Sequence, residues 1–205
     1  MRKMITVKIN GEERQYPQGA TYEDVANDYQ QEYENLIALA ARDGKIRELF
    51  KKLTRDCEVT FFTLKDDVGN KTYVRSATML FLKAVFDVYG REAAQSCRVE
   101  FAIGNGSYIS PRGQIAATED NAAKIRDRMR ELVEAKTPFL KRSYSLDNAM
   151  ELFHKEGMKD KEKLFRYRRG SFLNIYEMDG YYDYYYGYML PNAGYVKWFD
   201  VIAYD

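Results

Sequence analysis

Apolar and polar residues alternate at the start of the chain, as they do in a half-buried strand. Ile5, Val7 and Ile9 are separated by polar residues, and Asn10-Gly11 then provides the positive φ angles of a type I′ turn. The pattern predicts a β-hairpin whose second strand is EERQYP, residues 12–17.

One short helix and three more strands are expected after this hairpin. Thr21 precedes a helical stretch and has Asp24 three positions later, which is the pattern of a helix N-terminal cap. An apolar run at residues 36–41, a turn at Asp43-Gly44 and the segment after it predict two strands, and CEVTFFTL at 57–64 predicts the last. The order ββαβββ suggests a β-grasp unit.

The following stretch, LKDDVGNKTY, is polar and contains a Gly-Asn turn signal, so we expect a linker at residues 65–74. Ser76 is expected to cap a helix that stops at Gly90. The sequence CRVEFAIGNGSYIS then predicts a second hairpin with its turn at Asn105-Gly106.

Two further helices and a group of strands complete the predicted organisation. Thr118 begins a helix with one apolar stripe, and Ser145 begins another that ends at Gly157. The stretches SFLNIYEM, YYDYYY and YVKWFDVIAY predict strands, with a turn at Asp179-Gly180 between the first two. The chain is therefore expected to be α+β, with helices against an antiparallel sheet in its second part.

Charge and cysteine content exclude several kinds of function. The chain has 32 basic and 31 acidic residues, so it has no net positive field to hold a nucleic-acid backbone. Cys57 and Cys97 lie far apart without a CxxC pair, which argues against a disulfide framework and a cysteine-rich metal site. The chain lacks a long apolar run and starts directly with a strand pattern, so we expect a cytoplasmic protein without a membrane partner.

Nucleotide binding and histidine chemistry are not expected either. The Gly44-Lys45 pair lacks the upstream glycine loop of a P-loop, and the single histidine, His154, has no evident nucleophile beside it. Asp183 is different, because it interrupts a run of tyrosines at a predicted strand position. A desolvated carboxylate there needs a cationic or hydrogen-bonding partner, and the lysine-rich loop at 158–163 is a candidate source of one.

Two stretches, RSATM at 75–79 and DYYYGYMLP at 183–191, carry a resemblance to a known family. With the order of elements, they make the chain resemble the N-terminal region of bacterial threonyl-tRNA synthetase, whose editing helix opens with HSATH and whose later strand reads close to DLCRGPHVP. The resemblance implies a TGS domain of β-grasp fold at residues 1–64, a linker at 65–74 and an editing-like α+β domain at 75–205.

The resemblance keeps the scaffold but not the polar side chains of the editing site. Arg75 and Met79 occupy two histidine positions on the helix, while Tyr185 and Met189 occupy a cysteine and a third histidine position. Arginine cannot ligate a cation and a thioether is too soft to hold zinc. We therefore expect no catalytic residue, no metal and no cofactor in this cleft. Its candidate residues, which include a lysine and an aspartate that match the family, are Arg75, Met79, Lys161, Asp183, Tyr185 and Met189.

The same pair of domains, with a degenerate editing motif in the second, also resembles the N-terminal region of bacterial nucleoside kinases of the uridine kinase type. The stretch IGNGSYIS is similar to a GNGYY-type turn in that group. This resemblance implies a non-catalytic binding or regulatory region whose partner is a small polar ligand or its own kinase domain. ATP and Mg²⁺ are expected only if such a kinase domain follows.

Two alternatives remain open. One is an aminoacyl-tRNA editing hydrolase that acts through Lys161, Asp183 and ordered water. The other is an RNA-binding module with tRNA as its partner, in which tyrosines on one strand face stack on bases and arginines hold phosphates. The residues of this second alternative are Arg166, Arg168, Arg169, Tyr184, Tyr186 and Tyr188.

Overall fold

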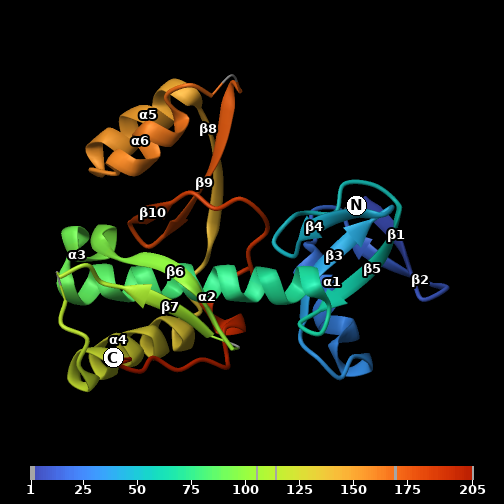
Figure 1. The fold of residues 1–205 in the computed structure, drawn as a ribbon. Coiled ribbons are helices and arrows are strands. Elements are labelled where there is room, and N and C mark those ends of the chain that lie inside the picture. Colours follow the sequence, from blue (N-terminus) through green and yellow to red (C-terminus); the bar gives the residue numbers. More distant parts are fainter. Residues whose placement is uncertain (1–2, 105, 114, 169, 205) are drawn as a thin grey trace. The chain divides into compact units, whose positions relative to one another are not determined.

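A computed structural model describes residues 3–104, 106–113, 115–168 and 170–204 of the chain. The chain divides into two compact units. The first comprises Met1–Ser76 with Gly187–Pro191, and the second comprises Ala77–Tyr186 with Asn192–Asp205. Both contain helices and strands, so the chain is α+β as expected (Figure 1).

The first unit contains a five-stranded sheet with the strand order β2-β1-β5-β3-β4. Strands β1 and β5 are parallel, and the other neighbouring pairs are antiparallel. The expected hairpin is present, with φ of 52° at Asn10 and 88° at Gly11 in its turn. The strands are β1 Met4–Ile9, β2 Glu12–Pro17, β3 Ile37–Arg42, β4 Lys45–Glu48 and β5 Cys57–Thr63.

Helix α1, Tyr22–Tyr29, follows the hairpin and begins at the predicted cap. The Thr21 hydroxyl accepts a hydrogen bond from the backbone of Asp24, and the Asp24 carboxylate accepts one from the backbone of Thr21. The helix buries Tyr22, Val25, Ala26 and Tyr29. It is followed by a short 3₁₀ turn, η1, at Gln30–Glu32.

The expected linker at residues 65–74 is mostly helical, because helix α2 already begins at Asp67 and continues to Tyr89. A Cβ atom on Gly69 would lie 1.9 Å from the backbone oxygen of Thr63, so this glycine permits close contact between chain segments rather than a turn. Ser76 does not cap the helix. It is buried inside it, and its hydroxyl donates a hydrogen bond to the Thr72 carbonyl.

The second unit contains a three-stranded antiparallel sheet of order β10-β9-β8 and a separate β6–β7 hairpin. The predicted alternation in β6 does not mark a buried face, since Val99, Phe101 and Ile103 are all exposed. The turn residue Asn105 lies outside the described residues. The strands are β6 Arg98–Ile103, β7 Gly106–Ser110, β8 Leu140–Ser145, β9 Phe172–Met178 and β10 Tyr181–Asp183.

Among the described residues, the second unit contains α2 from Ala77 onward and five further helical segments. Thr118 and Ser145 cap α4 and α5 as predicted. Residues 158–163, predicted as a loop, are largely helical because α6 begins at Lys159. The helices are α3 Arg91–Ser96, α4 Glu119–Glu134, α5 Leu146–Lys155, α6 Lys159–Phe165 and the 3₁₀ turn η2 Ala193–Tyr195.

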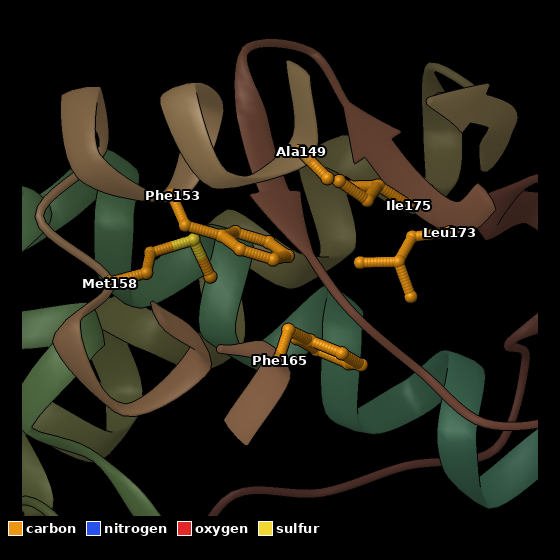
Figure 2. Packing of buried hydrophobic residues seen from close by; sticks show 6 residues of the cluster. All are labelled: Ala149, Phe153, Met158, Phe165, Leu173 and Ile175. Carbon is orange, nitrogen blue, oxygen red and sulfur yellow. The ribbon is translucent and has the colours of Figure 1, made fainter. Parts of the chain in front are cut away.

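Helices α5 and α6 pack on strand β9 through one apolar cluster (Figure 2). The rings of Phe153 and Phe165 stack with centroids 5.7 Å apart. Burying side chains of this size stabilises the fold by about 1.5–3 kcal/mol each, so the cluster fixes α6 against the sheet. Its members are Ala149, Phe153, Met158, Phe165, Leu173 and Ile175.

Two of the predicted strands are shorter or absent. The tyrosine stretch YYDYYY is a strand only to Asp183, because the backbone N–H of Tyr184 donates to the Asp183 carboxylate at 2.7 Å instead of continuing the ladder. The stretch YVKWFDVIAY forms no strand within the described residues. Across the same residues, no helix has the length and apolar character to cross a bilayer.

Candidate functional site

The second unit contains a cavity of about 230 Å³ beside the end of strand β10. Its wall is formed by helices α2 and α3, the start of β6, the start of α6 and the chain from Tyr181 to Tyr185. Apolar side chains such as Leu82 and Ala94 share this wall with charged ones such as Lys161 and Asp183. A small polar molecule would therefore find both apolar contact and charge here.

Asp183 is the most buried carboxylate on the wall, with 7% of the residue exposed. Its carboxylate lies 3.3 Å from the Lys161 ammonium and accepts hydrogen bonds from the backbone of Tyr184 and the hydroxyl of Tyr181. Burial raises the pKa of Asp183 above 3.8, although the attraction of Lys161 acts in the opposite direction.

Lys161 lies in the first turn of α6 and approaches a second carboxylate, that of Asp160, at 3.2 Å. Burial opposes its charged form, but the carboxylates of Asp183 and Asp160 outweigh this effect and raise the pKa of Lys161 above 10.5. The ammonium is therefore held charged, between one buried and one more exposed carboxylate.

A second charged group lies on the same wall. The guanidinium of Arg91 forms an ion pair with Glu156 at 2.5 Å, and the Gln95 side chain donates to the Glu156 carbonyl. Arg98 donates a hydrogen bond to the Gln95 carbonyl at 2.7 Å. The cavity thus presents cations and carboxylates in pairs, which is suited to a ligand that carries both donors and acceptors.

Cys97 also lines the cavity, although no sequence pattern predicts this position for it. Burial raises the pKa of its thiol to about 11, so the thiol is protonated at neutral pH. It directly precedes β6 and is far in sequence from Tyr185, the position at which the family resemblance placed a cysteine. Only the folded chain shows that this residue shares a wall with Asp183.

The six predicted cleft residues separate into two groups. Lys161, Asp183 and Tyr185 line the cavity. Met79 is fully buried on α2 and does not line it, and the remaining two, Arg75 and Met189, belong to the first unit. The cavity wall therefore contains three of the six predicted residues.

Arg75 and Met189 have structural contacts within the first unit. Arg75 donates a 2.7 Å hydrogen bond to the carbonyl of Tyr188. The backbone N–H of Met189 donates to the carboxylate of Glu48, and the N–H of Leu190 donates to the Ser76 hydroxyl at 2.9 Å. These bonds attach Gly187–Pro191 to residues far earlier in the chain.

The tyrosines of the RNA-binding alternative do not share one strand face, because β10 ends at Asp183. Tyr184 lies edge-on to Phe165 with ring centroids 4.6 Å apart, and its hydroxyl accepts from Arg168. Tyr186 is 89% exposed, and Tyr188 is half-buried in the first unit. Arg166 and Arg168 are exposed at the end of α6, and Arg169 lies outside the described residues.

The single histidine of the chain does not line the cavity. The His154 side chain is 86% exposed and lies 3.2 Å from Glu162, away from the cavity wall. Among the described residues, no three His, Cys, Asp or Glu side chains are grouped so that they could hold a metal ion.

Comparison with known proteins relates the chain to threonine–tRNA ligases. No protein-family profile matches it. It is 27% identical to the threonine–tRNA ligase of Thermotoga neapolitana over 98% of the chain, and 25% identical to that of Porphyromonas gingivalis over 92%. The ligase of Carboxydothermus hydrogenoformans is 24% identical over 97%. The chain covers only 31%, 29% and 31% of these three proteins, respectively.

Proposed function

Since the chain is related over nearly its whole length to a region of threonyl-tRNA synthetases, we propose that it is an editing-type region that binds the aminoacyl end of a tRNA or a similar small polar ligand. The observation that carries the proposal is the Lys161–Asp183 ion pair on the cavity wall. A carboxylate that is buried yet paired accepts hydrogen bonds from an ammonium or hydroxyl group of a ligand.

The size of the cavity supports a ligand no larger than an aminoacyl group. Its volume of about 230 Å³ lies below the roughly 300–1,000 Å³ typical of pockets for drug-sized molecules. A nucleoside would extend beyond it, while an amino-acid side chain with its ammonium group fits this scale. In this proposal the cavity recognises the acyl part and the remainder of the tRNA lies outside.

Binding without efficient hydrolysis is the version of this function that we favour. The Cys97 thiol is protonated at neutral pH, and Asp183 already accepts bonds from Lys161 and Tyr184. The Lys161 ammonium opposes full transfer of a proton to Asp183, as a general base would require, but it does not prevent Asp183 from accepting a hydrogen bond from a ligand. We therefore expect recognition to persist while hydrolysis of seryl-tRNA stays near the uncatalysed rate.

The first unit fits the TGS-like part of the proposal. Its sheet contains a parallel β1–β5 pair with β2 on one side and β3 and β4 on the other, and α1 connects the two hairpins of the sheet. This arrangement supports a β-grasp fold. The relatives described above are ligases rather than kinases, and for that reason we favour the editing-type function over a regulatory region of a nucleoside kinase.

Calorimetric titration with seryl- and threonyl-adenosine analogues, in which an amide replaces the ester, tests the proposal. Asp183→Asn should weaken binding at least tenfold, since charge-assisted hydrogen bonds contribute about 1.5–3 kcal/mol. Ala94→Leu should weaken binding independently, because it fills the cavity without touching the ion pair. Asp179→Asn, on an exposed side chain, is the matched control.

Equal affinity in wild type, Asp183→Asn and Ala94→Leu would refute the cavity as the binding site. Deacylation of seryl-tRNA provides a second measurement. A rate far above the blank that falls in Lys161→Met would replace the binding function with the hydrolase function.

A further inference from the structure

The end of helix α6 carries an exposed basic and aromatic surface that does not line the cavity. We call it the α6 patch and define it as Lys163, Arg166, Tyr167 and Arg168. Tyr167 is 84% exposed, which is unusual for a residue whose ring is mostly apolar. The sequence KLFRYR, residues 163–168, contains no acidic residue, although the whole chain has a net charge of only +1.

The arginines of the patch are held by rings rather than by carboxylates. The guanidinium of Arg166 lies 5.8 Å from the centre of the Tyr167 ring. That of Arg168 lies 5.4 Å from the Phe165 ring and donates to the Tyr184 hydroxyl at 3.4 Å. Within the described part of the chain, neither arginine forms an ion pair with a carboxylate. Both charges therefore remain available to an anion.

The α6 patch has a firm base. Phe165, directly before Arg166, is 3% exposed and belongs to the apolar cluster that fixes α6 on strand β9 (Figure 2). The Phe165 ring also contacts Tyr184. A ligand that binds the patch would therefore meet side chains whose backbone is anchored, which lowers the entropy lost on binding.

From these observations we infer that the α6 patch binds unpaired nucleic acid. The exposed Tyr167 ring offers a base a stacking surface, and the guanidinium groups of Arg166, beside this ring, and Arg168, beside Phe165, offer phosphates a charge partner. A duplex hides the faces of its bases, so stacking on Tyr167 requires an unpaired strand. An acidic peptide would use the arginines but would gain little from the ring. This inference does not depend on which ligand the cavity takes.

Fluorescence anisotropy of the full chain with a labelled unpaired RNA of about twelve nucleotides tests the inference. Tyr167→Ala should weaken binding about tenfold, since stacking contributes about 1–3 kcal/mol per base. The double variant Arg166→Gln/Arg168→Gln should reduce the slope of log affinity against log salt by about 1.4, or 0.7 for each lost phosphate contact on a single strand.

Matched controls come from the same chain. Tyr186→Ala removes a ring that is 89% exposed, and Arg130→Gln removes an exposed guanidinium on α4 that pairs with Asp127. Both should leave affinity and salt dependence unchanged. Absence of binding at low salt, equal binding of a duplex, equal binding of a polyglutamate peptide, or wild-type affinity in Tyr167→Ala would each overturn the inference.

Discussion

The guanidinium of Arg75 donates to the backbone carbonyl of Tyr188 at 2.7 Å and lies directly over Gly187. A Cβ atom at position 187 would be 2.6 Å from the Arg75 Cζ, closer than real Cβ contacts come. Gly187 also has a φ of +132°, a conformation that side chains with a Cβ rarely adopt. One glycine thus permits both the path of the chain and the position of the arginine.

Gly187→Ala should destabilise the protein by about 1–3 kcal/mol through backbone strain, and more if the Arg75 bond is lost as well. Urea unfolding measures this change. Gly180→Ala is the matched control, because Gly180 has a φ of +79° but no atom within 4 Å of its added Cβ. If both variants lose the same stability, crowding by Arg75 has no energetic role.

Lys83 should be a strong determinant of stability in the second unit. Its side chain is 3% exposed, lies 2.7 Å from Asp87 and 3.3 Å from Asp179, and donates to the Asp179 carbonyl. Lys83→Met removes one partner of Asp87, which keeps its ion pair with Arg128, and the donor to the Asp179 carbonyl, and it should cost about 1–3 kcal/mol. Asp179→Asn should cost less than about 1 kcal/mol, because that side chain is 67% exposed. Chemical denaturation of both variants provides the comparison, and similar losses would contradict it.

The pKa values at the cavity predict a loss of stability in alkaline solution. The pKa of Lys161 is raised above 10.5 by its carboxylate partners against the effect of burial, so the folded state holds its proton longer than the unfolded state does. The contribution of Lys161 to the free energy of unfolding is complete below pH 10.5 and is lost as pH rises through the pKa that Lys161 has in the folded state. Burial raises the pKa of Tyr181 well above 10.0, so this residue also lowers the stability of the fold as the solution becomes more alkaline.

Unfolding free energies measured from pH 9 to pH 11.5 test this pH dependence. We expect Lys161→Met and Tyr181→Phe each to flatten the decline above about pH 10 relative to wild type. Asp183 changes stability in the same direction at lower pH. Burial raises its pKa above 3.8, so its contribution to the free energy of unfolding falls as pH rises through the pKa of the folded state. A decline of unchanged slope in both variants would show that other groups cause it.

Cys97 should react slowly with thiol reagents. With a pKa of about 11, only about one thiol in a thousand is ionised at pH 8, and the residue is 7% exposed. Alkylation followed by mass spectrometry should label the more exposed Cys57 first, and labelling of Cys97 should accelerate up to about pH 11. Faster labelling of Cys97 than of Cys57 at neutral pH would contradict the raised pKa.

Local patterns predicted the elements that depend on local physics. The β1–β2 hairpin follows from alternation and an Asn-Gly turn, and the caps of α4 and α5 follow from Thr118 and Ser145. The position of Asp183 in a predicted strand indicates that its carboxylate needs a cationic or hydrogen-bonding partner, and the structure places Lys161 beside it. Each of these inferences uses only neighbours in sequence or the cost of burying a charge.

The sequence misled where a contact that alternation and turn signals do not encode decides the structure. The pattern around Gly69 predicts a turn. In the structure Gly69 lies inside helix α2, where the Thr63 carbonyl leaves no room for a Cβ atom. The tyrosine strand stops at Asp183 because that side chain captures the next backbone N–H. Cys97 shows no pattern at all, since only tertiary structure brings it to the cavity wall.

The position of β5 at the centre of the first sheet has a consequence for synthesis on the ribosome. Strand β5 is the last of the five in the chain, yet it lies between β1 and β3. Until it emerges, the nascent chain has only two separate hairpins with open edges, and such edges invite aggregation. Gly187–Pro191 joins this unit later still. Its assembly therefore finishes only after Pro191 has been translated, long after the five strands have emerged.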